Sequence, residues 1–196
     1  AAYAGSLRIA FVSTLMCLLI GYPMAYAIAR ARKDLQTVLL LLIMMPTWTA
    51  ILIRVYAWMG ILSSNGILNG LLQNLRLIDT PLQILNTDLA VYIGVVYSYL
   101  PFMILPLYSV FEDLKQELLL ASHDLGAGRL STFVHVIVPL TLPGVLAGVM
   151  LVLLPAMGLF FVPDILGGSR NLLVGNVIKN QFLDARNWPF GAAASI

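Results

Sequence analysis

The sequence predicts an all-α integral membrane protein that folds as a multi-span helix bundle. Composition is the first reason: 60% of the 196 residues are hydrophobic and only 10% are charged, whereas a soluble domain carries roughly 25% charged residues. The second reason is that four stretches stay apolar over about 20 residues, the length of helix that crosses a hydrocarbon core roughly 30 Å thick. The third is a polar, helix-forming segment between the last two stretches, which cannot lie in lipid.

Four spans are expected, all within one transmembrane domain that covers residues 1–196. Each contains proline, which a spanning helix tolerates where neighbouring groups satisfy the freed carbonyl, so each is a candidate kink. The spans lie at about 7–29, 35–59, 89–111 and 140–162. A last apolar span begins near residue 190, and we expect the chain to be an internal fragment of a longer membrane protein.

The basic residues of the connections predict which side of the membrane each loop faces. Residues 30–34 form a tight basic connection, and short loops rich in Lys and Arg lie on the cytoplasmic side. The segment at 112–139 then also lies in the cytoplasm, and the loop at 63–88 lies outside. The tail at 164–188 falls outside as well, although its basic residues run against this bias. Within the external loop, residues 67–75 have helical spacing and predict a short helix at the membrane surface.

The polar segment at 112–139, called the connecting segment below, predicts two short helices joined at an angle. Residues 115–127 are mostly helix formers. Gly126 lies where that helix would end, because glycine tolerates the left-handed conformation that closes a helix. A second helix is expected at about 131–138, stopped by Pro139. Leucine side chains would give the pair an apolar face for the groove of a partner protein.

The connecting segment also contains a spaced motif. Leu120-Ala121-Ser122 is followed by Gly126, and nine residues later by Val136-Ile137-Val138-Pro139. This resembles the cytoplasmic loop of the membrane subunits of bacterial ABC importers, which reads Glu-Ala-Ala, three residues, glycine, nine residues and Ile-x-Leu-Pro. Leucine replaces the family's glutamate at position 120, and serine replaces its second alanine at 122. The resemblance implies that the segment couples to an ATPase through Leu120, Ala121, Ser122, Asp124, Gly126, Ala127, Phe133 and Pro139.

Short stretches along the whole chain carry a closer resemblance. Examples are Leu52-Ile53-Arg54-Val55-Tyr56-Ala57-Trp58, Leu153-Leu154-Pro155-Ala156-Met157-Gly158 and Gly175-Asn176-Val177-Ile178. They are similar to the permease subunits of spermidine/putrescine ABC importers, which belong to the binding-protein-dependent importer permease family. The resemblance implies the ABC importer permease fold, in which the connecting segment is the coupling-helix loop. Of that fold, this chain would lack the first span and most of the last.

The family also implies a location, partners and a substrate. A multi-pass protein of the bacterial inner membrane is expected, assembled with a second permease subunit, cytoplasmic ATP-binding subunits and a periplasmic solute-binding protein. The substrate would be a polyamine, putrescine or spermidine. ATP hydrolysis is expected in the partner subunits, so this chain would not itself be an enzyme. The alternatives are an importer permease for another solute, such as iron or an amino acid, and a membrane scaffold protein.

Four residues are candidates to line the path of a polyamine. Asp164 follows Phe160 at the external end of the fourth predicted span, where an acid is costly unless it faces water or a cation. Carboxylates and aromatic faces are the groups that bind flexible polycations. Phe160, Trp48 and Tyr97 would supply the aromatic faces. The alternative readings are that Asp164 is an acid of the headgroup region and that the aromatic residues are part of the interfacial belt.

The sequence gives little indication of catalysis, of a metal site or of nucleic-acid binding. A formal charge of only +2 is too small for the basic field that attracts nucleic acid. The chain has one cysteine, Cys17, and its two histidines, His123 and His135, lack the spacing of helical metal ligands. We therefore expect no metal and no cofactor. Arg54, inside the second predicted span, is expected to extend its charged end to the outer interface; the alternative is that it orients a carboxylate near the path or contacts the binding protein.

Overall fold

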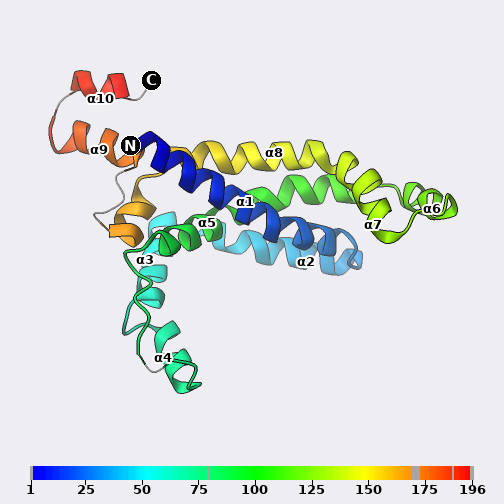
Figure 1. Ribbon diagram of the computed structural model, residues 1–196, viewed down its shortest axis with the longest axis horizontal. Coiled ribbons are helices and arrows are strands. Elements are labelled where there is room, and N and C mark those ends of the chain that lie inside the picture. The colour runs from blue at the N-terminus through cyan, green and yellow to red at the C-terminus, as the bar shows by residue number, and fades with distance from the viewer. Residues whose placement is uncertain (1, 79, 169–172, 187, 195–196) are drawn as a thin grey trace. The chain divides into compact units, whose positions relative to one another are not determined.

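The computed structural model describes residues 2–78, 80–168, 173–186 and 188–194, which form helices and connecting loops with no strand among them (Figure 1). The α-helices are α1 (Ala2–Ala29), α2 (Lys33–Met44), α3 (Ile51–Leu62), α4 (Ile67–Asn74), α5 (Asp88–Glu112), α6 (Gln116–Asp124), α7 (Arg129–Thr132), α8 (Val138–Met157), α9 (Val174–Leu183) and α10 (Trp188–Ala194). Three shorter elements join them: the 3₁₀-helix η1 (Met45–Trp48) and the π-helical turns η2 (Phe133–Ile137) and η3 (Pro163–Gly167).

Among the described residues, four helical stretches are long and apolar enough to cross a membrane: Ala2–Ala29, Ile51–Asn74, Asp88–Glu112 and Arg129–Met157. The first and third enclose the predicted spans at 7–29 and 89–111. Both are uninterrupted helices, although α1 contains Pro23 and α5 contains Pro101 and Pro106. Proline therefore does not end these two helices, in line with its tolerance inside spanning helices.

The predicted span at 35–59 is divided into two helices by a turn. α2 ends at Met44, η1 contains Pro46, and α3 begins at Ile51. Proline favours such a break because it has no N–H and its ring clashes with the carbonyl four residues earlier. Thr49 fixes the turn, since its backbone N–H and its hydroxyl both donate to the carbonyl of Pro46, at 3.3 and 2.8 Å.

The predicted span at 140–162 is also interrupted. α8 ends at Met157, residues 158–160 are not helical, and the chain becomes helical again at Phe161 before it enters η3. The interruption begins at a glycine, Gly158, whose backbone entropy disfavours helix. It places the Phe160 carbonyl and the Asp164 side chain on a short, separately oriented segment.

The chain forms two compact units, each with its own core. Unit 1 comprises residues 1–14, 46–98 and 153–196, and unit 2 comprises residues 15–45 and 99–152. The core of unit 2 consists of side chains with no exposed surface, among them Cys17, Met103, Ile104, Leu107 and Val152. The core of unit 1 includes Val91, Val95, Val162 and Leu166.

Helix packing in unit 2 depends on two glycines of α8. Gly144 and Gly148 have the four-residue spacing that lets membrane helices approach closely. A Cβ atom added at Gly148 would lie 2.7 Å from the Met103 Sδ atom, and one at Gly144 would lie 2.8 Å from Cγ2 of Val110. Because these positions have no side chain, α8 lies directly against α5, and Figure 1 shows the two helices running toward α6 and α7.

In unit 1, the loop after α4 is held by one buried amide. The Asn69 side chain donates to the carbonyls of Ser63 and Leu82, at 3.1 and 3.0 Å, and accepts from the N–H of Leu82 at 2.9 Å. Asn69 is only 1% exposed. The predicted short helix at 67–75 is present as α4. Its residue Asn69 anchors the loop that follows by hydrogen bonds.

Candidate functional site

The connecting segment contains two short helices joined at Gly126. α6 closes there in the left-handed conformation, with φ of +83° at Gly126. The N–H of Ala127 donates to the carbonyl of Ser122 at 3.0 Å, which is the hydrogen bond of a Schellman helix end. The positive φ expected at Gly126 is thus confirmed. Gly128, two residues on, has an extended conformation and precedes α7.

A buried pair of hydroxyls holds the two helices together. Ser122 Oγ donates to the carbonyl of Leu119 at 2.7 Å and lies 3.0 Å from the Thr132 Oγ1 atom of α7. Both side chains are buried, at 7% and 4% exposure. Ser122 is the residue that departs from the alanine of the family loop, and its hydroxyl points inward. It therefore contributes to the shape of the segment rather than to its outer surface.

The second helix continues past the position where it was predicted to stop. α7 is followed without interruption by η2 and α8, so Pro139 lies in the first turn of α8 and the prediction of a stop at Pro139 was wrong. The wider π-turn explains the difference: the N–H of Val138 donates to Phe133, and a π-bulge changes the local hydrogen-bond register around a residue that cannot donate. The connecting segment is thereby joined directly to a long apolar helix.

Three leucines are strongly exposed on the outer surface of the connecting segment. Leu125 and Leu130 are 88% and 78% exposed, and Leu120 is 63% exposed. Of the other predicted coupling residues, Ala121, Asp124, Gly126, Phe133 and Pro139 are exposed and Ala127 is half-buried. An exposed run of leucines on a polar loop is the kind of surface that a partner protein covers. Figure 1 shows α6 and α7, which carry these leucines, at the end of the unit 2 helices.

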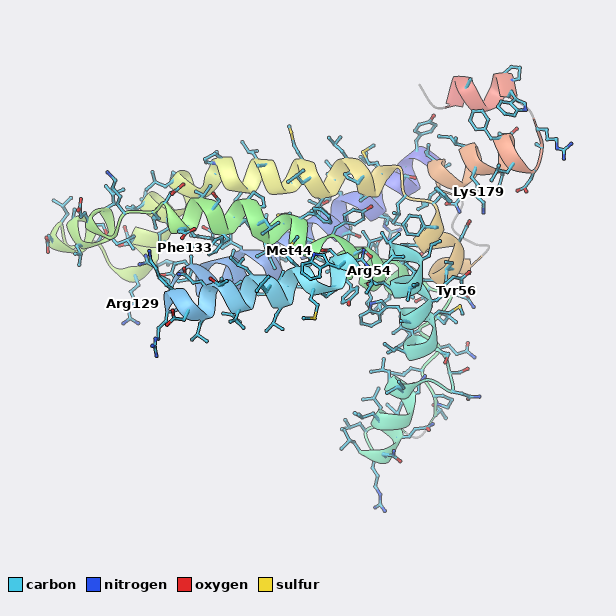
Figure 2. The ribbon with its side chains drawn as sticks, turned by 180° about the vertical axis from the view of Figure 1, so that it is seen from behind. Met44, Arg54, Tyr56, Arg129, Phe133 and Lys179 are labelled. Atoms are coloured by element: carbon cyan, nitrogen blue, oxygen red, sulfur yellow. The ribbon has the colours of Figure 1, made fainter. Side chains whose placement is uncertain are left out.

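Behind that surface, unit 2 has an apolar cavity of about 600 Å³ between α1 and the connecting segment. Phe133 packs edge-to-face on Tyr22, with ring centroids 6.0 Å apart, and Tyr22 packs on Phe111 at 5.0 Å. The Tyr22 hydroxyl lies 2.9 Å from the Thr141 hydroxyl of α8. Figure 2 labels Phe133 and Arg129 at this end of the unit. The cavity is lined by Tyr22, Pro23, Tyr26, Leu119, Arg129, Thr132, Phe133 and Ile137.

A second cluster, in unit 1, surrounds the predicted path residue Asp164. Its carboxylate accepts a hydrogen bond from the Lys179 ammonium at 2.6 Å and another from the Asn176 amide. The same ammonium lies 5.9 Å from the centroid of the Phe160 ring. The hydrogen bond to Asp164, and the charge of that carboxylate, raise the pKa of Lys179 above its ordinary value. Asp164 and Phe160 thus surround one cation, which belongs to the chain itself.

Close packing of α9 on the interrupted stretch positions this cluster. A Cβ atom added at Gly175 would lie 2.8 Å from the carbonyl oxygen of Gly158 and 3.1 Å from that of Leu159. The adjacent Asn176 reaches the Phe160 carbonyl with its amide at 3.2 Å. Because α9 begins so close to residues 158–160, its next turn carries Lys179 to Asp164. Figure 2 labels Lys179 on α9.

The two remaining predicted path residues lie elsewhere in unit 1. Trp48 is 76% exposed on η1. Tyr97 packs edge-to-face on Trp58 with centroids 5.4 Å apart, and both line a cavity of about 270 Å³ that also contains Arg54. The Nε and Nη1 atoms of Arg54 are buried without a hydrogen-bond partner among the described residues, which differs from the expectation that its charged end reaches the outer interface. Figure 2 labels Arg54 on α3.

Sequence reasoning missed Lys179, Asn176 and the tyrosines of α1. Lys179 was read as a loop charge that opposed the orientation rule, and no spacing along the chain links it to Asp164. Tyr22 and Tyr26 were read only as part of an apolar span. Within the described residues, no group of three or more His, Cys, Asp or Glu side chains is placed to hold a metal ion.

The chain is similar in sequence to known transport proteins. The model of the family described as "Binding-protein-dependent transport system inner membrane component" matches residues 17–196. The chain is 53% identical over 191 residues to the spermidine/putrescine transport system permease protein PotB of Escherichia coli (strain K12), a match that covers 97% of this chain and 70% of that protein. The protein of the same name from Haemophilus influenzae is 52% identical, over 97% of this chain and 67% of its own length.

The fold is also similar to solved structures. A bacterial alginate ABC transporter in complex with an alginate pentasaccharide-bound periplasmic protein matches with a TM-score of 0.75, over 99% of this chain and 70% of that chain. A second structure, of an ABC transporter involved in the import of the acidic polysaccharide alginate, matches with a TM-score of 0.69 over 98% and 72%. Sequence identity is 15% in both cases, so these matches concern the fold alone.

Proposed function

Because the chain belongs to the family of binding-protein-dependent transport system inner membrane components, it is an ABC importer permease subunit of the bacterial inner membrane, and we propose that its substrates are the polyamines putrescine and spermidine. The observation that carries the proposal is identity of 52–53% over 97% of the chain with proteins named as spermidine/putrescine permeases. Its partners would be a second permease subunit, cytoplasmic ATP-binding subunits and a periplasmic solute-binding protein. ATP would be hydrolysed by the ATP-binding subunits, and this chain would supply the path.

In this proposal the connecting segment is the surface on which an ATP-binding subunit docks. Its support is the run of exposed leucines, Leu120, Leu125 and Leu130, on two helices that Ser122 and Thr132 hold together. A docking element must keep its shape when pulled, and a satisfied buried hydrogen bond and a glycine-closed helix end both favour that.

Movement of the docked surface would pass into the membrane through α8. The helical chain is continuous from α7 through η2 to α8, so a displacement of the connecting segment acts directly on that helix. Phe133 and Thr141 extend the effect to α1 through their contacts with Tyr22. Proline and glycine sites in these helices are where the spans would bend.

The unit 1 cluster supports a substrate that carries an ammonium group over a metal ion. A carboxylate beside an aromatic ring is a site for an ammonium group, and in this chain it already holds one. An Fe³⁺ ion binds to several oxygen or nitrogen ligands, whereas among the described residues no group of three or more His, Cys, Asp or Glu side chains is placed to hold a metal ion. The chemistry of the cluster therefore favours an organic amine over a metal ion as the solute.

The test is the solute dependence of ATP hydrolysis by the full complex in lipid nanodiscs, with its solute-binding protein present. We expect putrescine or spermidine to stimulate hydrolysis, and Fe³⁺, glutamate and maltose to leave it at the basal rate. If Fe³⁺ or an amino acid stimulates hydrolysis and neither polyamine does, the transported solute is that ion or amino acid and not a polyamine.

A further inference from the structure

Resting on the proposed function, we propose that Lys179 is a built-in occupant of an ammonium site, and that an ammonium group of the transported polyamine displaces it. The site consists of the Asp164 carboxylate, the Phe160 ring and the Asn176 amide. Lys179 Nζ lies 2.6 Å from Asp164 Oδ2 and 5.9 Å from the Phe160 ring centroid. These two groups are the ones that a primary ammonium ligand would use.

The site is built independently of its occupant. Asn176 donates its amide to the other carboxylate oxygen of Asp164 and to the carbonyl of Phe160. Asn176 is buried, at 4% exposure, and its neighbour Gly175 is held against the backbone of residues 158–160. The carboxylate therefore keeps its orientation when the ammonium of Lys179 leaves, because a second donor still holds it.

The ammonium of Lys179, by contrast, can leave the site. The side chains of Lys179 and Asp164 are 34% and 35% exposed, so the rest of this chain does not enclose either of them. The lysine stem has four rotatable carbons, and its ammonium is well solvated when released. Exchange of one primary ammonium for another changes neither the charge of the group that the carboxylate holds nor the kind of contact that it makes.

Such an exchange would give the path a selectivity of its own. A neutral or anionic solute cannot replace Lys179, because it would leave the carboxylate without a counter-cation. A polyamine can, and the returning lysine then competes with it and promotes its release. The site therefore binds an ammonium group of the polyamine only transiently, because Lys179 competes with the polyamine for the Asp164 carboxylate.

The test is equilibrium binding of radiolabelled spermidine to the complete complex in nanodiscs, without solute-binding protein, for the wild type and three variants. Lys179→Gln removes the competitor and should bind about two- to fivefold more tightly, the range expected for loss of a partly exposed ion pair. Lys179→Arg keeps a cation and should bind as the wild type does. Asp164→Asn should lose saturable binding. Co-purification of all subunits verifies that each variant assembles.

Unchanged or weaker binding in Lys179→Gln would overturn the proposal, as would the absence of saturable binding to a wild-type complex that transports spermidine. A purely structural ion pair makes a different prediction: the double variant Asp164→Lys with Lys179→Asp would restore wild-type binding and transport. A wild-type complex that transports no polyamine at all would instead refute the proposed substrate, which separates the two failures.

Discussion

At the scale of single residues, Asp164 and Arg54 have contrasting environments. Asp164 has two donors, Lys179 and Asn176. Arg54 has two guanidinium nitrogens buried without a hydrogen-bond partner in the described part of the chain. A buried guanidinium needs an anion or a polar partner, and the described residues supply none to these two atoms. Charge removal at Asp164 therefore tests a site whose contacts are known.

We predict that Asp164→Asn lowers spermidine uptake about tenfold or more, because a charge-assisted hydrogen bond to an ammonium is lost while side-chain volume is kept. Uptake into proteoliposomes measures it, and Asp34→Asn is the matched control, since Asp34 is an exposed acid in the first turn of α2 that pairs with Arg32, away from the cluster. Uptake at the wild-type level, with unchanged concentration dependence, would make Asp164 an acid of the headgroup region.

Gly126 provides a second prediction at this scale. Its φ of +83° is strained for a β-branched residue by about 1–3 kcal/mol, although nothing lies within 4 Å of an added Cβ atom. We expect Gly126→Val to insert normally but to weaken association of the ATP-binding subunits, measured by co-purification. Gly128→Val is the control, because Gly128 has equal space and an ordinary extended conformation. Equal loss of the ATP-binding subunits in both variants would contradict a specific role for the left-handed turn.

At the scale of elements, the sequence predicts helices and their ends where one feature is clear, such as an apolar run or the glycine that closes α6. The prolines of α1 and α5 do not interrupt these helices, whereas α2 ends just before Pro46, whose carbonyl accepts two hydrogen bonds from Thr49. The left-handed end of α6 followed from Gly126, but the continuation through Pro139 required a π-turn for which the sequence has no plain signal. Contacts between distant elements, such as Lys179 with Asp164, depend on tertiary packing and have no periodicity to reveal them.

The packing of α9 offers a prediction about elements. Gly175→Ala would place a methyl group 2.8 Å from the Gly158 carbonyl oxygen, and backbone cannot move aside as a flexible side chain can. We expect a cost of about 1–3 kcal/mol and a shift of α9 that separates Lys179 from Asp164, observed as a lower Tm and reduced uptake. Gly70→Ala, with nothing within 4 Å of the added atom, should change neither. A wild-type Tm for Gly175→Ala would refute the close approach.

At the scale of the whole molecule, orientation in the membrane stays a prediction from the basic connection at 30–34. The structure indicates which residue of the external loop is suited to a reporter cysteine. Asn69, in the loop expected outside, is buried and unsuited to a reporter cysteine, whereas Gly70 is exposed with space around it. In a Cys17→Ser background, Gly70→Cys should react with a membrane-impermeant thiol reagent in intact cells, and Arg32→Cys, also exposed, should react only after permeabilisation. The reverse pattern would invert the topology.

The central claim is that this chain forms the path of an ATP-driven polyamine importer. The most direct measurement is uptake of radiolabelled spermidine by proteoliposomes that contain both permease subunits and the ATP-binding subunits, with ATP inside and the solute-binding protein outside. We predict uptake that requires ATP and the solute-binding protein, that unlabelled putrescine or spermidine competes for, and that the Gly126→Val variant loses. Uptake that proceeds equally without this chain, or no spermidine uptake by a complex that imports a different solute, would contradict the account.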